Sequence, residues 1–166
     1  MVHIRVESAA DIDGIYAVNA AAFETDAEAR LVNGLRQSGT DPFISLVAAQ
    51  DGHVVGHILF TPVEIGEWRA VALGPMAVAP ASQRRGIGSM LVLAGLKACA
   101  EAGEQVVCVL GHPEYYPRFG FRRMSEFGLT CEFKAPDNVL MVAELKPGAI
   151  AGRTGEVRYH SLFKTV

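Results

Sequence analysis

The chain has 166 residues, half of which are hydrophobic, and a formal net charge of −3 at pH 7. This length is typical of one domain with a sizeable core, and the apolar content excludes a disordered protein. The slightly acidic balance excludes a general attraction to nucleic acid.

After a first strand over residues 3–7, two helices are predicted from their start signals. Ser8-Ala-Ala-Asp11 resembles a capping box, in which two side chains bond the free N–H groups of a first helical turn. Thr25-Asp-Ala-Glu28 has the same form before a second helix that ends at Gly39. In this interpretation Glu28 is the reciprocal partner of the cap.

Three strands are expected next, over residues 43–50, 53–62 and 68–78, from their β-rich composition. Asp51-Gly52 between the first two strands is a strong signal for a two-residue hairpin. Gly74-Pro75 interrupts the third strand. Because proline cannot donate a hydrogen bond to a neighbouring strand, we expect a bulge or a sheet edge there.

A strand–helix–strand unit follows, with a strand end at 76–78, a helix over 86–102 and a strand over 106–110. The helix carries apolar residues at a period of 3.6, and Leu93 and Leu96 widen its apolar face, so we expect it to be well buried. The continuous apolar run at 106–110 is typical of a parallel strand that is covered on both faces.

The remaining elements are shorter: a helix over 114–119 and strands over 129–133, 140–145 and 156–159. We expect one α/β domain over residues 1–146 with a mixed sheet. We expect the tail, residues 147–166, to pack on the same domain.

Two glycines, Gly86 and Gly88, open the predicted helix directly after a strand and a short loop. The first N–H groups of a helix have no internal partner, and the helix dipole adds positive charge there. Glycines let another molecule approach the backbone closely, and Arg84 and Arg85 add full charges. The segment therefore predicts an anion site suited to a phosphate or pyrophosphate.

Two common nucleotide motifs do not fit this segment. The chain has no G-x-x-x-x-G-K-[ST] run, as a P-loop requires. The dinucleotide fingerprint needs a third glycine where Leu91 stands, and an acid near the end of the next strand, where Gly111 and His112 stand.

The run Gln83-Arg-Arg-Gly-Ile-Gly88 resembles the pyrophosphate-binding motif, Q/R-x-x-G-x-G/A, of the GNAT family (GCN5-related N-acetyltransferases). Glu114-Tyr-Tyr-Pro-Arg-Phe-Gly-Phe121 resembles that family's aromatic-Tyr-x-x-x-Gly-Phe signature. The resemblance covers residues 3–145. The segment 23–36 and the tail 152–163 are most similar to the bacterial YhbS-like group within the family.

The resemblance implies a GNAT fold: a mixed, mostly antiparallel sheet, splayed between its fourth and fifth strands, with helices on both faces. It implies acetyl-CoA as cosubstrate, with no metal, and a primary amine as acceptor, attacked in a ternary complex. The residues expected to contact the cofactor are Met76, Ala77, Val78, Gln83, Arg84, Arg85, Gly86, Ile87, Gly88, Ser89, His112, Tyr115, Tyr116 and Phe119.

In the family's signature, Tyr116 takes the place of the usual general acid, which protonates the leaving thiolate. Glu28 stands where family members often place an acid near the substrate, so it is a candidate general base as well as a candidate cap. Glu24 is a weaker rival for the base. Arg118 and Arg122 are candidates for a further contact with a coenzyme A phosphate.

Several alternatives stay open at this point. The same fold can bind coenzyme A as a sensor without catalysis, a different nucleotide phosphate can occupy the glycine loop, and the donor can carry a longer acyl group. The acceptor amine cannot be identified from the sequence. A homodimer is conceivable, with residues 139–145 as an apolar partner surface.

The three cysteines form no CxxC pair, and the apolar surroundings of Cys99 and Cys108 predict small buried hydrophobes in a reducing compartment. The five histidines show no metal-ligand spacing. With no signal peptide or membrane-length apolar run expected, the predicted location is cytoplasmic.

Overall fold

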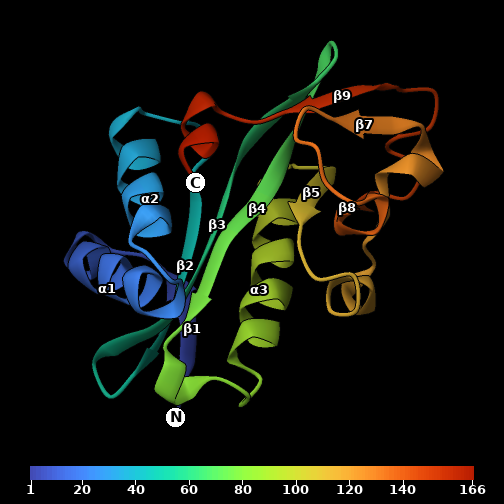
Figure 1. The fold of residues 1–166 in the computed structure, drawn as a ribbon. Helices are drawn as coiled ribbons and strands as arrows, with labels where there is room; N and C mark the ends of the chain where they lie inside the picture. The colour runs from blue at the N-terminus through green and yellow to red at the C-terminus, as the bar shows by residue number, and fades with distance from the viewer.

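A twisted mixed sheet runs through the molecule, and helices cover both of its faces (Figure 1). The computed structural model describes residues 1–166. The strands are β1 (His3–Val6), β2 (Ile44–Gln50), β3 (His53–Ile65), β4 (Trp68–Val78), β5 (Val106–Leu110), β6 (Arg122–Arg123), β7 (Leu129–Cys131), β8 (Leu140–Glu144) and β9 (Gly155–Arg158). The helices are α1 (Ile12–Ala22), α2 (Ala27–Gln37) and α3 (Ile87–Glu101), with 3-10 turns η1 (Ala9–Asp11), η2 (Pro80–Ser82), η3 (Tyr116–Phe119), η4 (Met124–Phe127), η5 (Asp137–Val139) and η6 (Ser161–Thr165).

The first four strands form an antiparallel sheet in chain order. The predicted hairpin joins β2 to β3, and Asp51 and Gly52 both have positive φ, 52° and 79°, as a type I′ turn requires. Side chains alternate between the faces: Leu46 packs in the cluster under α3, whereas Val47 packs in the cluster under α1 and α2.

Strands β4 and β5 pair in parallel only from Val71 opposite Val107 to Leu73 opposite Val109. Gly74-Pro75 follows directly, and proline has no N–H to donate to β5. The predicted bulge is present as a register shift between β3 and β4. Beyond it β4 pairs with β3 alone, so the sheet is splayed open between β4 and β5, as expected.

Helix α3 packs on the sheet through Leu91, Val92 and Gly95. A Cβ atom at Gly95 would lie 2.3 Å from the ring of Phe60, so glycine permits this close approach. The expectation of an apolar face widened by Leu93 is wrong, because Leu93 lies on the side away from the sheet and is 59% exposed.

The C-terminal part of the chain makes pairings that local patterns do not indicate. Strand β8 pairs with β5 and with the short, unexpected β6, whereas β7 pairs in parallel with β9. Met141, Val142 and Ala143 are buried between these neighbours, so the segment 139–145 is not an exposed partner surface. None of the helices has the length and apolar character that crossing a membrane requires.

Candidate active site

The glycine loop lies at the N-terminus of α3, as predicted. Gly86 is the N-cap residue with φ of 80°, and Arg84 also has a left-handed φ of 65°. This turn directs the first amides of a 15-residue helix toward an open pocket of about 380 Å³. The pocket is lined by Val78, Ser82, Gln83, Arg84, Gly86, Ile87, Gly88, Ser89, Tyr115 and Arg118.

The second predicted motif meets this loop in space. The Tyr115 hydroxyl lies 3.2 Å from Ser89 Oγ, and a Cβ atom at Gly88 would lie 3.2 Å from the same hydroxyl. The Arg118 guanidinium stacks on the Tyr115 ring at 4.8 Å. Arg122 lies elsewhere, paired with Glu126 at 2.7 Å, so the structure brings only Arg118 of the two candidates to the loop.

The end of β4 carries backbone groups that no strand pairs on the β5 side. Ala79 donates its N–H to Val55 of β3, so by alternation the peptide groups of Val78 and Met76 point away from β3. The Val78 carbonyl accepts a hydrogen bond from the Gln83 side chain at 3.0 Å. The N–H of Val78 and both groups of Met76 are directed into the opening between β4 and β5.

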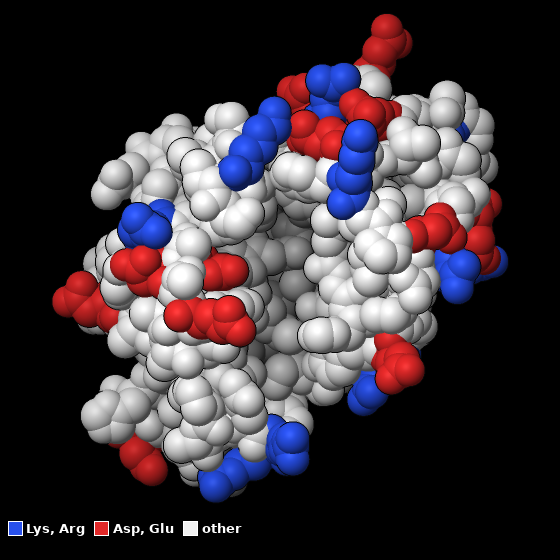
Figure 2. Space-filling view, in the orientation of Figure 1, with Lys and Arg blue, Asp and Glu red and all other residues white.

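A cavity of about 520 Å³ adjoins this edge and lies in the groove that runs down the face of the molecule in Figure 2. It lies between α1 and α2 on one side, the ends of β4 and β5 behind, and the C-terminal segment at one end. Its lining residues are mostly apolar: Phe23, Glu28, Leu31, Leu73, Gly74, Pro75, Met76, Val109, Leu110, Gly111, His112, Tyr116, Phe133, Tyr159, Phe163 and Val166.

Tyr116 faces this cavity and is only 7% exposed. Its ring packs edge-on against Tyr115 and Phe121, and it lies so close to Gly111 that a Cβ atom there would be 2.3 Å from the ring. Burial, with a smaller contribution from Tyr115, raises the pKa of Tyr116 to about 12. The phenol is therefore protonated at neutral pH and can act as a proton donor.

Glu28 also lines the cavity, from the first turn of α2. The predicted capping box around it does not form. Asp26 occupies the N-cap position instead, and Thr25 Oγ1 accepts a hydrogen bond from the N–H of Ala27 at 3.2 Å. Glu28 thus lines the cavity without capping its own helix, whereas Glu24 is not part of the cavity wall.

The remaining residues predicted to contact the cofactor lie in different places relative to the glycine-loop pocket and the larger cavity. His112 lines the central cavity just after β5, whereas Phe119 supports the Tyr115 ring from a centroid distance of 5.2 Å. Ala77 is buried, with its side chain on the other face of β4 from its neighbours. Arg85 is exposed and is not part of the pocket lining.

A buried Ser45–His57–Asn19 cluster has the composition of a nucleophilic triad but not its function. All three residues are at most 2% exposed. Asn19 Nδ2 contacts the Ile15 carbonyl and so must be a donor, which makes His57 Nδ1 its acceptor and leaves the ring proton on Nε2, facing Ser45. His57 therefore donates to Ser45 and cannot activate it, and the cluster joins α1 to β2 and β3.

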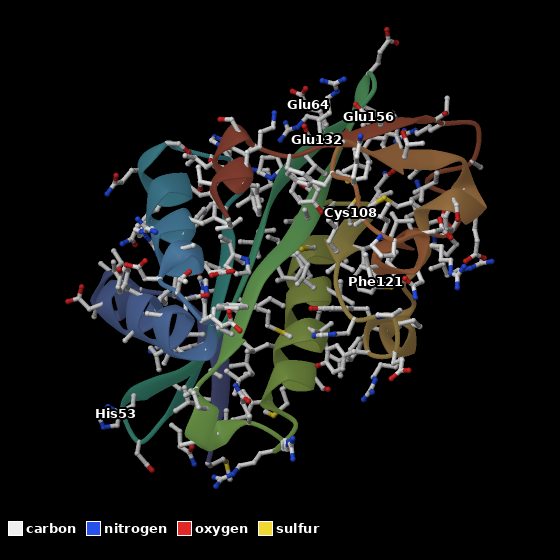
Figure 3. All side chains as sticks on the ribbon, in the orientation of Figure 1. His53, Glu64, Cys108, Phe121, Glu132 and Glu156 are labelled. Atoms are coloured by element: carbon white, nitrogen blue, oxygen red, sulfur yellow. The ribbon has the colours of Figure 1, made fainter.

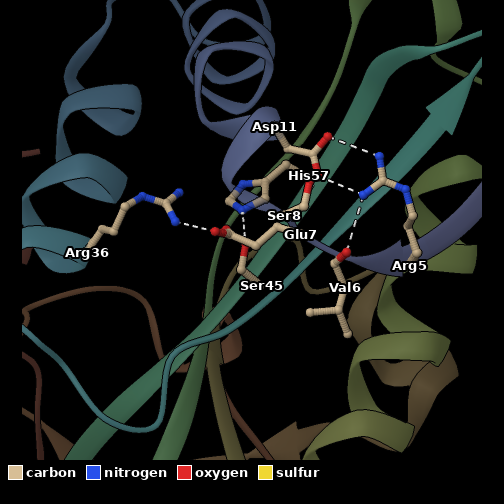
Figure 4. A network of polar contacts seen from close by, with 8 residues as sticks. All are labelled: Arg5, Val6, Glu7, Ser8, Asp11, Arg36, Ser45 and His57. Carbon is tan, nitrogen blue, oxygen red and sulfur yellow. Dashed lines mark hydrogen bonds and ion pairs between the residues drawn. The ribbon is translucent and has the colours of Figure 1, made fainter.

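A second contact, which is half-buried, fixes α2, the helix that carries Glu28. The Arg36 guanidinium forms an ion pair with Glu7 at the end of β1, close to the His57 cluster (Figure 4). Arg5 holds Asp11 in a two-pronged contact of 2.6 and 3.0 Å, and Asp11 Oδ2 accepts the Ser8 N–H, so the predicted capping box is present here. These contacts position both helices on their side of the cavity.

Sequence reasoning missed the aromatic part of the cavity wall. Phe133, Tyr159 and Phe163 come from segments without any motif, and they meet because β9 pairs with both β3 and β7. The only signal in the sequence was the spacing of aromatic residues in an otherwise polar tail, and this spacing indicates no particular site.

Comparison with known proteins gives a consistent family. A sequence model of the acetyltransferase (GNAT) domain matches residues 41–123. YhbS of Escherichia coli, named an uncharacterized N-acetyltransferase, is 39% identical over 165 residues, which cover 96% of this chain and 97% of that protein. YjhQ of the same organism is 40% identical over 124 residues, covering 72% of this chain and 67% of that protein.

Solved structures agree with these relatives. The crystal structure of E. coli YhbS in complex with CoA superposes with a TM-score of 0.94 at 37% identity, over 98% of this chain and 92% of that one. A GNAT acetyltransferase from Brucella melitensis in complex with acetyl-CoA gives a TM-score of 0.81 at 34% identity, over 98% of both chains. The chain belongs to the GNAT family of N-acetyltransferases.

Proposed function

We propose that the protein transfers the acetyl group of acetyl-CoA directly to a primary amine, with both substrates bound at once. One observation carries this proposal: the pocket at the glycine loop (the phosphate pocket) and the cavity of about 520 Å³ (the central cavity) lie next to each other, because neighbouring residues of the same segments line the two. Val78 and Tyr115 line the pocket, whereas Met76 and Tyr116 line the cavity. A long molecule anchored by an anion at the glycine loop thus has its far end at Tyr116.

The residues present fit each part of acetyl-CoA. The amides after Gly86 and the exposed Arg84 and Arg118 suit the diphosphate. The unpaired backbone groups of Met76 and Val78 suit the amides of the pantetheine arm, because buried amides need partners. When bound there, acetyl-CoA supplies a thioester carbon that is open to attack by nitrogen.

The protein's own groups move the protons. An alkyl amine has a pKa near about 10.4 and is mostly protonated at neutral pH, so Glu28 takes up the ammonium proton directly or through water. The new C–N bond forms as the C–S bond breaks, the nitrogen releases its second proton to solvent, and Glu28 then releases to solvent the proton that it took up. Tyr116 donates its phenolic proton to the departing sulfur and is reprotonated from solvent.

The support for Tyr116 in this role is its burial, its protonated state and its position in the cavity wall. The support for Glu28 is that it is the only carboxylate among the side chains that line the cavity. His112 is assigned a binding role, since it is exposed at the cavity edge.

Two measurements test this function. Calorimetry should detect one coenzyme A site per chain, and acetyl-CoA should release free thiol only when an amine acceptor is present. Initial-rate plots with both substrates varied should give intersecting lines, as a ternary complex requires. Parallel lines would reject direct transfer, and binding without thiol release on any amine would favour the sensor alternative.

A further inference from the structure

The part of the central cavity lined by the α1–α2 region and the C-terminal segment, which we call the acceptor side, is mostly aromatic. This composition is unusual for a site that takes up a charged amine. Rings of Phe23, Phe133, Tyr159 and Phe163 form this side. Phe133 and Phe163 flank the Tyr159 ring, with centroid distances of 5.2 and 5.1 Å. Phe133, Tyr159 and Phe163 therefore form one continuous aromatic surface, the aromatic wall.

The polar end of Tyr159 does not enter the cavity. Its hydroxyl is buried and has no hydrogen-bond partner, and burial raises the pKa of this phenol well above its usual value. Only the ring of Tyr159 is therefore presented to a ligand, and the surface offers no hydrogen-bond donor there. A polar group on the acceptor would lose its water on this surface without replacement.

The aromatic wall is held in place by contacts outside the cavity. Glu132 accepts the N–H of Tyr159 at 2.6 Å and approaches Lys164 at 3.5 Å. Leu162 packs so closely on α2 that a Cβ atom at Gly34 would lie 3.0 Å from it. Figure 3 shows Glu132 and Glu156 near β9, at the top of the view. The wall is thus formed before any ligand binds.

Among the side chains that line this cavity, Glu28 is the only carboxylate, and there is no Lys or Arg. Glu28 supplies a carboxylate from α2, and Figure 2 shows further acidic side chains along the α1 and α2 side of the groove. At the β9 end, Lys164 approaches Glu132 and Arg158 pairs with Glu156 at 2.9 Å, whereas the exposed Lys134 has no acidic partner and is not part of the cavity lining. One ammonium group is therefore accommodated at Glu28, and the cavity lining offers no Lys or Arg side chain to an anion.

We propose that the acceptor is a small primary amine with one positive charge and an aromatic or similarly apolar body. This inference rests on the proposed function and names its substrate class. The ammonium lies at Glu28, near the thioester, and the body lies against Phe133, Tyr159 and Phe163. A free carboxylate on the acceptor is repelled by Glu28, and a second ammonium would meet only ring faces, with no second carboxylate in the cavity lining to pair with.

The test compares three amines with purified protein: 2-phenylethylamine, phenylalanine and spermidine. We expect kcat/KM for 2-phenylethylamine to exceed that for the other two amines by at least about tenfold. The carboxylate of phenylalanine is repelled by Glu28, and spermidine has additional ammonium groups and no aromatic body. A preference for spermidine or for phenylalanine would overturn the inference.

Two variants locate the effect. Phe163→Ala should raise KM for 2-phenylethylamine about tenfold, with kcat and the coenzyme A dissociation constant within about twofold. Phe127→Ala, which removes a half-buried ring outside the cavity, is the matched control and should leave that KM unchanged. Equal KM values for the two variants would overturn the inference.

Coenzyme A binding separates failure of this inference from failure of the proposed function. If the protein binds coenzyme A and acetylates another class of amine, only the inference is wrong. If it binds coenzyme A but acetylates no amine, the proposed transfer is wrong and the inference falls with it. Glu28→Gln should lower kcat/KM for 2-phenylethylamine, whereas Glu101→Gln, at the far end of α3, should not.

Discussion

The cofactor side and the acceptor side of the groove are built in different ways. The cofactor side is formed by two segments that are close in the chain: the one from β4 to α3, and η3. These segments bind the cofactor through backbone amides, which glycines leave accessible. The acceptor side comes from α1, α2 and the C-terminal segment, which are at opposite ends of the chain. It presents side chains rather than backbone.

This difference has a consequence for specificity. A backbone cradle recognises one constant ligand, since its geometry hardly depends on side-chain identity. A wall of side chains from distant segments can change without disturbing the cradle. The molecule thus separates a fixed donor site from an acceptor site that can vary, so a single substitution can change one site without the other.

The largest expected effect is on the chemical step, where the two sides meet. Tyr116→Phe removes one oxygen and should lower kcat by about 10² to 10⁴, the usual contribution of a general acid, with KM for acetyl-CoA nearly unchanged. Steady-state kinetics measure both constants. A kcat within about twofold of the parent would reject the acid role.

Tyr115→Phe serves as the comparison for that variant. The Tyr115 hydroxyl contacts Ser89 at the glycine loop rather than the cavity. Its loss should therefore change KM for acetyl-CoA and leave kcat nearly as it was. If both variants lower kcat equally, the division into pocket and cavity is wrong.

On the cofactor side, Gly88→Val should weaken coenzyme A binding about 10- to 100-fold. The new side chain would enter the space between Tyr115 and Met76, where a Cβ atom alone would be 3.2 and 3.6 Å from them. This corresponds to about 1.4 to 2.8 kcal/mol of binding free energy. Calorimetry gives the affinity, and circular dichroism shows whether α3 is retained. Unchanged affinity in a folded variant would place the anion elsewhere.

On the acceptor side, acid should destabilise the attachment of α1. Burial, and to a smaller extent the charge of Arg36, lowers the pKa of His57 to about 3. The unfolded state therefore binds a proton below its ordinary pKa of about 6.5 while the folded state does not. The free energy of unfolding should fall by up to about 1.4 kcal/mol per pH unit as the pH decreases below 6.5.

Denaturant titrations between pH 7 and 4.5 measure this slope. Asp11, whose pKa is held below its usual value chiefly by Arg5, adds a further loss only from about pH 4 downward, so the two effects separate. His57→Leu removes the titrating group. The account predicts a flatter pH profile for this variant, whatever its stability at pH 7, and an equally steep one would contradict it.

The smallest effect distinguishes two arginines. Arg118→Ala should raise KM for acetyl-CoA by up to about tenfold, the equivalent of one charged hydrogen bond of about 1.5 kcal/mol. Arg122→Ala should leave KM unchanged, because Arg122 pairs with Glu126 away from the glycine loop. An equal increase of KM for acetyl-CoA in both variants would contradict the placement of Arg118, but not Arg122, at the glycine loop.

The features that sequence predicted well are those with local causes. The Asp51-Gly52 hairpin, the start of α3 at Gly86 and the splay after Gly74-Pro75 each follow from the conformations that glycine and proline allow. The mixed GNAT fold with helices on both faces is confirmed.

The features that sequence missed depend on distant partners. The aromatic wall exists only because β9 pairs with β3 and β7, and no local signal encodes that pairing. The sequence pattern predicts that Glu28 takes part in a capping box, whereas in the structure Asp26 is the N-cap residue and no capping box forms. The sequence predicts that Leu93 widens the apolar face of α3, but an apolar residue beside that face is not necessarily covered by the sheet, and Leu93 is exposed.

The central claim is that one cavity holds the donor carbon and the amine together. A bisubstrate analogue, coenzyme A joined through an acetyl bridge to 2-phenylethylamine, tests it in a single calorimetric titration. The account predicts that this compound binds at least about 10²-fold more tightly than coenzyme A, because it occupies both sides of the cavity at once. Equal affinity for the two compounds would contradict it.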